Sequence, residues 1–151
     1  MSSATQRVQE SNDELAIRAV IESVGRAHHD KNAAGIVAPY AKDAVIYDLA
    51  PPLSHVGMDL KQKQEWLDTW EGPLDREVLD LKIEVTGDFA LGHGYYRLGG
   101  TPKSAGRPIS FWMRATVALR REGNEWQIVH EHTSVPFYMD GSFRPAFDLQ
   151  P

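Results

Sequence analysis

The segment Trp126-Gln-Ile-Val-His-Glu-His-Thr-Ser134 follows a turn and has the composition of a β-strand. Successive side chains of a strand point to opposite faces, so a two-residue period predicts that five of its side chains share one face. These are Trp126, Ile128, His130, His132 and Ser134. The shared face begins apolar and ends polar. Such a gradient indicates a strand that passes from a core to the mouth of a pocket.

Three further strands are predicted before this segment, over residues 76–86, 90–98 and 108–121. Turn residues at Gly87-Asp88 and a glycine-containing loop over 99–106 separate them. Because consecutive strands joined by short turns pair with one another, these strands and residues 124–135 predict an antiparallel meander.

Helical patterns precede the strands. Ser11 and Glu14 form a capping-box pattern, and the apolar residues that follow recur at helical spacing, which predicts a first helix from Ser11. Shorter helices are predicted over residues 33–40 and 59–71, with a strand at 44–48 between them. Helices followed by a run of hairpins indicate an α+β fold whose sheet curls around the first helix.

The length of 151 residues predicts one domain. Residues 1–11 are polar and without period, so we expect a flexible tail, followed by the domain over 12–135. Residues 136–151 carry several aromatic side chains, which predict that this second tail packs on the domain or on a dimer partner.

Composition excludes some classes of function. The formal charge of −5 argues against nucleic-acid binding, which requires a clustered basic face. The absence of cysteine excludes disulfides, thiolate nucleophiles and zinc-thiolate sites. Since no segment reads as a signal peptide or a membrane span, we expect a cytoplasmic location and no membrane partner.

Three motifs carry a family resemblance. They are Tyr40-Ala-Lys-Asp-Ala-Val-Ile-Tyr-Asp48 with Gly57 after it, Arg114-Ala-Thr116, and residues 126–134 before Pro136. Through them the chain resembles the SnoaL-like group of the nuclear transport factor 2-like superfamily, which includes ketosteroid isomerases, polyketide cyclases and the association domain of calcium/calmodulin-dependent kinase. The resemblance implies a cone-shaped α+β barrel of curved, mostly antiparallel sheet around N-terminal helices. It also implies a deep pocket and a homodimer formed through the sheet.

Asp48 lies in a segment similar to the one that bears the general base of ketosteroid isomerases. A carboxylate beside a dry cavity can shuttle a proton at carbon. That isomerase chemistry also needs acidic donors for the enolate, and here Val24 and Trp112-Met-Arg114 stand at or near those positions. Ketosteroid isomerase activity itself is therefore not expected. Asp48 could instead bond backbone amides at a strand end.

Arg114 and Thr116 share a strand face, opposite an apolar one. Arginine is costly to bury without a partner, so Arg114 is predicted either to anchor a ligand carboxylate or enolate or to form an internal salt bridge with Asp48 or Glu131. His130 is a candidate base or ligand contact, and His132 and Ser134 are predicted to line the same pocket.

His130 and His132 alternate as a metal pair would, but a metal site needs a third ligand. His55, His93, His28 and Asp48 are candidates with no distinctive spacing, so no metal or other cofactor is expected. Aromatic residues are predicted to form the pocket walls, or else the core. These are Tyr47, Trp66, Trp70, Tyr95 and Trp112.

The sequence thus predicts a homodimeric, cofactor-free domain that binds a small apolar or aromatic ligand carrying an oxygen or carboxylate. Catalysis, if present, is expected to be proton transfer at carbon by an isomerase, cyclase or dehydratase, with Asp48 or His130 as base and Arg114 as stabiliser. The alternative is a non-catalytic association module, which the resemblance of residues 126–134 to the kinase association domain favours.

Overall fold

The structure is a computed structural model that describes residues 3–151, with side chains described for 3–5 and 12–151. Its elements in chain order are α1 (Ala4–His29), α2 (Ala33–Val37), β1 (Tyr40–Tyr47), β2 (His55–Val56), α3 (Leu60–Leu67), β3 (Trp70–Thr86), β4 (Phe89–Pro102), β5 (Ile109–Glu122) and β6 (Glu125–Ser134). Helices precede a run of long strands, which confirms the predicted α+β class. Among the described residues, no helix has the length and apolar character needed to cross a membrane.

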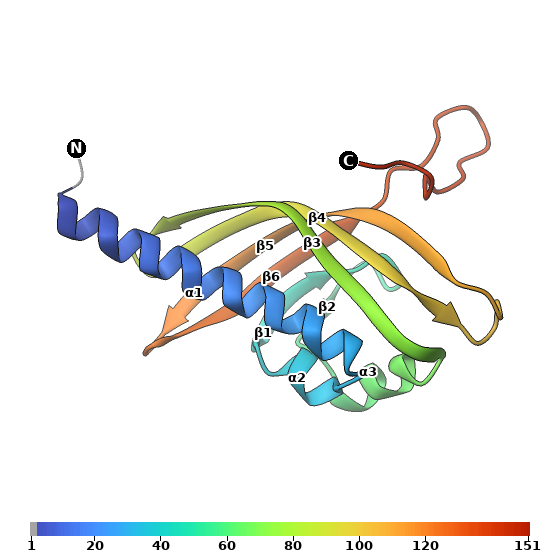
Figure 1. Ribbon diagram of the computed structural model, residues 1–151, viewed down its shortest axis with the longest axis horizontal. Coiled ribbons are helices and arrows are strands. Elements are labelled where there is room, and N and C mark those ends of the chain that lie inside the picture. Colours follow the sequence, from blue (N-terminus) through green and yellow to red (C-terminus); the bar gives the residue numbers. More distant parts are fainter. Residues whose placement is uncertain (1–2) are drawn as a thin grey trace.

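The strands form one six-stranded sheet in the order β2-β1-β6-β5-β4-β3. Strands β3 to β6 pair antiparallel with their chain neighbours, as the meander prediction requires. Strand β1 pairs parallel with β6, and β2 pairs antiparallel with β1. The sheet is curved and unclosed, with α1 crossing its concave side and α2 and α3 at one end of α1 (Figure 1).

The core lies between α1 and the concave side of the sheet. Ile17, Ile21 and Val24 recur at the spacing of one helical face and are almost fully buried. Gly25 continues this face at the closest approach of helix and sheet, because a Cβ there would lie 2.6 Å from the carbonyl oxygen of Arg76. Glycine at this position therefore allows α1 to pack against β3.

Several predicted boundaries are wrong, among them the start of the first helix and the end of the third. Helix α1 begins at Ala4, so Ser11 lies within it and the expected flexible tail is mostly helical. No glycine or proline interrupts residues 4–10, so nothing in their sequence opposes the helix. Helix α3 ends at Leu67, and Trp70 begins β3. Gly72 and Pro73, which follow the predicted end of this helix, instead lie within β3, where the pairing with β4 shifts register between Glu71 and Asp75.

A β-bulge in β6 overturns the single alternation predicted for residues 126–134. Leu119 pairs with Ile128 and Ala118 pairs with His130, so Val129 is an extra residue without a cross-strand partner in this ladder. An extra residue exchanges the two faces of the rest of the strand. Trp126 and Ile128 are buried with Glu131 and Thr133 on the concave side, and the histidines lie on the other side.

Residues 136–149 fold back on themselves after β6. Phe137 and Pro145 form an isolated antiparallel bridge, and the Ala146 amide donates to the carbonyl of Pro136 at 2.8 Å. The Phe147 ring packs on Phe111 of β5 with centroids 4.5 Å apart. This segment extends as a loop beyond the end of the sheet (Figure 1).

Candidate functional site

Six polar residues on the concave side form what we call the interior polar cluster, and most are deeply buried. They are His28, Tyr40, Lys63, Arg76, Tyr96 and Glu131. The Tyr40 hydroxyl donates to one Glu131 oxygen at 2.8 Å, and Arg76 Nη2 donates to the other at 3.2 Å. The cluster links α1, β1, α3, β3, β4 and β6.

The charge of Arg76 is stabilised although its side chain is only 10% exposed. Burial opposes the charge, but the Glu131 carboxylate and the Tyr40 and Tyr96 hydroxyls outweigh it and raise the pKa of Arg76. Its guanidinium also lies over the Tyr96 ring, 4.2 Å from the centroid. Burial, together with the negative charge of Glu131, raises the pKa of both tyrosines. The two phenols therefore stay protonated and remain donors.

His28 is held neutral in the last turn of α1. Burial, and then the positive charge of Arg76, lower the pKa of His28 from 6.5 to about 3. Its Nδ1 lies 2.7 Å from the carbonyl oxygen of Val24, and its ring meets Trp66 edge-on at 5.9 Å between centroids. A protonated histidine would be favourable at a helix C-terminus, but burial lowers the pKa of His28 and keeps its ring neutral.

Lys63 on α3 is the least enclosed cation of the interior polar cluster. Its ammonium lies over the Trp66 ring, 4.9 Å from the centroid, and makes no ion pair or hydrogen bond with the described residues. Burial lowers the pKa of Lys63, and the charge of Asp48 partly opposes that shift while Arg76 adds to it. An amine with a lowered pKa in reach of carboxylates can both stabilise an anion and exchange a proton.

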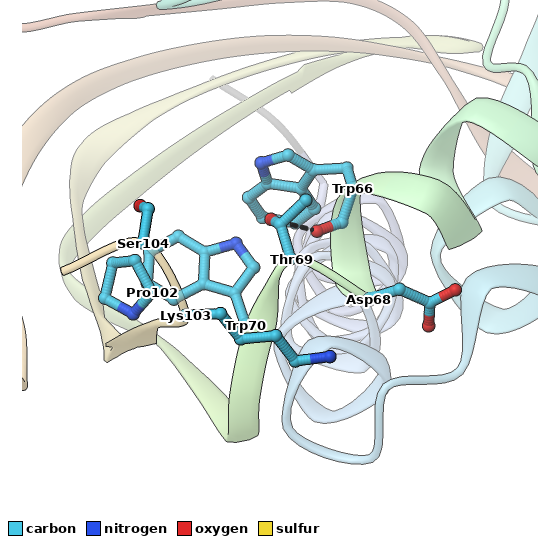
Figure 2. A pocket seen from close by; sticks show the side chains of 7 residues that line it. All are labelled: Trp66, Asp68, Thr69, Trp70, Pro102, Lys103 and Ser104. Atoms are coloured by element: carbon cyan, nitrogen blue, oxygen red, sulfur yellow. Dashed lines mark hydrogen bonds between the residues drawn. The ribbon is translucent and has the colours of Figure 1, made fainter. Parts of the chain in front are cut away.

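Trp66 also lines an open pocket of about 530 Å³. The pocket lies between the end of α3, the start of β3 and the turn after β4 (Figure 2). Trp66 and Trp70 meet at 71° with centroids 5.8 Å apart, and Pro102, Lys103 and Ser104 face them. Two predicted wall residues, Trp66 and Trp70, are thus brought together here. We call this space the α3 pocket.

Most of the other predicted site residues gather on the opposite side of the sheet. This convex surface, called here the outer face, carries Tyr47, Tyr95, Trp112, Arg114, Thr116, His130, His132 and Ser134. Arg114 Nε donates to the Ser134 hydroxyl at 3.1 Å, and the Tyr47 ring contacts both histidines edge-on. The predicted residues are therefore neighbours, but they do not line the concave interior with Trp126 and Ile128.

The Arg114 salt bridge considered from the sequence does not form with either named carboxylate. Arg76, on β3, holds Glu131 instead. Asp48 follows β1 and is exposed, with one oxygen accepting from the Leu49 amide at 2.9 Å and the other 3.9 Å from His55 Nε2. The backbone bond at a strand end matches the structural role considered for Asp48, while its charge still acts on Lys63.

Sequence reasoning missed four members of the interior polar cluster as site residues: Tyr40, Lys63, Arg76 and Tyr96. One feature of the sequence could have identified Glu131, the carboxylate that joins them. Glu131 sits between two histidines in a segment otherwise assigned to a pocket, and a strand must turn one of these neighbours inward. Among the described residues, no group of three or more His, Asp and Glu is arranged to hold a metal ion.

Comparison with known proteins gives a consistent family. The profile of the SnoaL-like domain matches residues 17–138. A search of curated proteins gave no match. A solved NTF2-like protein of unknown function from Pseudomonas putida KT2440 is 35% identical, with a TM-score of 0.79 over 96% of this chain and 98% of that one.

Two other solved structures share the fold at low identity. A protein from Novosphingobium aromaticivorans DSM 12444, provisionally named a scytalone dehydratase, is 12% identical with a TM-score of 0.75, over 95% of this chain and 99% of its own. A protein from Xanthomonas campestris, provisionally named a calcium/calmodulin dependent protein kinase II association domain, is 18% identical with a TM-score of 0.65. That match covers 78% of this chain and 84% of the other.

Proposed function

Because this chain belongs to the SnoaL-like domain family, we propose that it binds a small, mostly apolar or aromatic molecule beside α3 and transfers a proton at carbon there. One observation carries the proposal: Trp66 lines the α3 pocket and also contacts Lys63 and His28 of the interior polar cluster. Aromatic walls next to a few polar groups are typical of small-molecule sites.

The proposed reaction uses Asp48 as the base and Lys63 as the stabilising cation. The Asp48 carboxylate removes a proton from the carbon next to a carbonyl, and the electron pair moves to the carbonyl oxygen as an enolate. The Lys63 ammonium stabilises that oxygen. Return of the proton from Asp48 to another carbon of a conjugated enolate completes an isomerisation. In a dehydration, the enolate expels the β-hydroxyl group, and the proton from Asp48 passes to it so that it leaves as water. Lys63 takes the role expected for Arg114.

Arg114 and His130 lie on the outer face, so a ligand beside Trp66 contacts neither. The interior polar cluster and the body of the sheet separate them from the α3 pocket. The provisional dehydratase name of the Novosphingobium relative supports a dehydration of this kind. The proposal needs no metal or organic cofactor.

Thermal-shift screening with polyketide-like ketones and aromatic acids tests the binding site. We expect ligands that stabilise the wild type to lose their effect in Trp66→Leu and to retain it in Arg114→Ala, the matched change on the outer face. The opposite pattern, or no stabilising ligand at all, would contradict the proposal. Proton exchange at the α-carbon of a bound ketone, followed by NMR in D2O, then tests catalysis and should fall in Lys63→Met.

A second proposal concerns assembly. We propose that two copies associate through the outer face, where Val45, Tyr47, Leu79, Leu91 and Tyr95 are each 37% to 41% exposed. Several large apolar side chains exposed on one face of a sheet indicate an interaction site. The Xanthomonas relative with an association-domain name supports the same use of the fold. Assembly through this surface and ligand binding beside α3 are compatible, because they use opposite sides of the sheet.

A further inference from the structure

Three of the six histidines lie on the outer face without an acidic partner, and we call them the outer histidines. They are His93 on β4 and His130 and His132 on β6. The other two histidines that water reaches are paired, His29 with Asp75 at 3.1 Å and His55 with Asp48 at 3.9 Å. Among the described residues, no ion pair or hydrogen bond joins an outer histidine to a carboxylate.

The outer histidines occupy two neighbouring rows of cross-strand partners. One row runs across the sheet through Val56, Val45, His130, Ala118 and Leu91. The next row runs through Tyr47, His132, Thr116, His93 and Lys82. Side chains that are directly opposite on paired strands are close neighbours on one face. A second copy that covers the apolar row of the outer face therefore covers the outer histidines as well.

The imidazoles of β6 are held on the surface by their neighbours. His130 Nδ1 lies 2.7 Å from the carbonyl oxygen of Val45, and because a carbonyl only accepts, this nitrogen carries a hydrogen. Nε2 is then the nitrogen that gains a proton in acid. The Tyr47 ring meets His130 and His132 edge-on, with centroids 4.9 Å and 5.3 Å away. Protonation of these rings therefore changes the charge of the outer face itself.

The charge around the outer histidines is nearly balanced at neutral pH. Among the described residues, the charged and titratable side chains in their rows and the adjacent ones are Asp43 and Tyr47 of β1, Lys82 and Glu84 of β3, Tyr95 of β4, and Arg114 and Arg120 of β5. Three cations and two carboxylates leave a charge of about +1, and three imidazolium groups would raise it to about +4. Acid therefore turns a nearly neutral surface into a strongly positive one.

We propose that two copies associate across the outer face only while the outer histidines are neutral, so that acidification separates them. This inference rests on the association proposed above and adds its regulation. In the dimer the outer histidines of both copies lie between the two sheets, where imidazolium groups would face one another with less water around them. Repulsion between like charges and the cost of desolvating them both oppose the contact. Histidine suits this control because its charge changes between pH 5 and 8.

Proton linkage gives the direction and size of the effect. Because the dimer favours uncharged imidazoles, it binds fewer protons than two separate copies do. Its stability is therefore complete above the ordinary histidine pKa of about 6.5 and falls as the pH drops below that value. One histidine per copy that stays neutral in the dimer raises the dissociation constant about a hundredfold between pH 7.5 and 5.5.

Sedimentation equilibrium at pH 7.5 and 5.5 tests the inference. We expect the wild-type dissociation constant to rise at least about a hundredfold, and the triple variant His93→Gln/His130→Gln/His132→Gln to associate equally at both pH values. Near-UV circular dichroism follows the fold in each sample. The triple variant retains His28, so any acid weakening of the fold is common to both proteins. His29→Gln, away from the outer face, is the matched control and should keep the full pH dependence.

A second measurement needs no variant. Dilution calorimetry of the wild type at pH 6.0, in two buffers of different ionisation enthalpy, gives the number of protons bound when the dimer separates. A histidine with the ordinary pKa is about three quarters protonated at this pH. We therefore expect each copy to take up at least that fraction of a proton on separation.

An uptake near zero, or equal dissociation constants at pH 7.5 and 5.5, overturns the inference and leaves association through the outer face intact. Equal loss of the dimer at pH 5.5 in the wild type and the triple variant also overturns it, because the outer histidines are then not the cause. A wild type that is monomeric at pH 7.5 refutes both the inference and the proposed association. The calorimetric result remains decisive even if the triple variant does not fold or associate.

Discussion

The Tyr40 hydroxyl and Arg76 Nη2 hold the two oxygens of one carboxylate, that of Glu131, at 2.8 Å and 3.2 Å. Tyr40 is on β1 and Arg76 is on β3, which lies at the far edge of the same sheet. Only a strongly curved sheet can bring these two strands to one side chain. The three-residue contact therefore fixes the curvature of the sheet on its concave side.

Replacing Glu131 with Gln should destabilise the fold by about 3 kcal/mol, because it leaves the buried Arg76 charge without its partner. The glutamine can still accept the hydrogen bond from Tyr40, so the measured loss of stability reports the removal of the Glu131 charge alone. Urea unfolding measures the effect. Glu77→Gln is the matched control, since Glu77 pairs with Arg97 at 2.8 Å in an exposed position and should cost at most about 1 kcal/mol. Equal losses in the two variants would contradict the assignment.

His28 should make the fold sensitive to acid. The pKa of His28 is about 3 in the folded protein and 6.5 in the unfolded chain. Between these two pH values the unfolded chain therefore binds one more proton than the folded protein does. Stability is then complete above pH 6.5 and falls by about 1.4 kcal/mol per pH unit as the pH drops toward 3. His28→Gln should flatten this slope in urea unfolding at several pH values, with His29→Gln as the exposed control. An unchanged slope in His28→Gln would refute the prediction.

Lys63 should react with amine reagents at a lower pH than an ordinary lysine does. Burial lowers the pKa of Lys63, so half of its amine is neutral at a pH below the usual lysine pKa of 10.5. Competitive acetylation followed by mass spectrometry gives the pH midpoint for each lysine. Lys61 is the reference, because it lies on the same helix with its side chain 87% exposed. Identical midpoints for the two residues would show that the environment of Lys63 does not shift its pKa.

A charge on the outer face should prevent association without unfolding the chain. Leu91→Asp places a carboxylate on the surface through which two copies are proposed to pair, and its desolvation opposes the contact. Analytical ultracentrifugation should show a dimer for the wild type and a monomer for the variant. Leu53→Asp, at a residue 97% exposed on a loop, is the control and should stay dimeric. A wild-type monomer at micromolar concentration would rule out the dimer.

The contact between Phe111 and Phe147 should hold the last segment in place. Phe147→Ala removes an aromatic pair worth about 1 kcal/mol and frees residues 138–149 to open. Hydrogen exchange should increase at the Ala146 amide, which is bonded to Pro136. Phe143→Ala changes an exposed ring that contacts only this segment and should leave that amide protected. The prediction fails if both variants exchange alike.

The arrangement of elements was predictable because periodicity and turn residues act locally. The strand run and the apolar face of α1 follow from such signals, and the structure confirms both. Boundaries were less predictable. Nothing local distinguishes the start of α1 at Ala4, and Trp70 is compatible with a helix until its pairing with Pro102 places it in β3.

The candidate site was predictable only in part, for a reason that lies in long-range pairing. Trp66 and Trp70 were identified as wall residues, since aromatic side chains near a predicted cavity supply most of its surface. His130 was assigned to the interior because the extra residue at Val129 is invisible until β6 pairs with β5, and Arg114 was assigned to the same pocket as His130. Arg76 was missed because its partner Glu131 is distant in sequence and faces the interior only after that bulge.

The bulge at Val129 also determines which sequence changes β6 can accept. Consecutive residues of β6 lie on opposite sides of the sheet. Glu131 is part of the interior polar cluster, and His130 and His132 lie on the outer face. Substitutions at the histidines change the outer face and leave the interior polar cluster unaltered, and the reverse holds for Glu131. A single deletion in this strand, by contrast, would exchange the two sets of side chains at once. A point mutation in this part of β6 therefore changes one side of the sheet, whereas a change of length alters both sides.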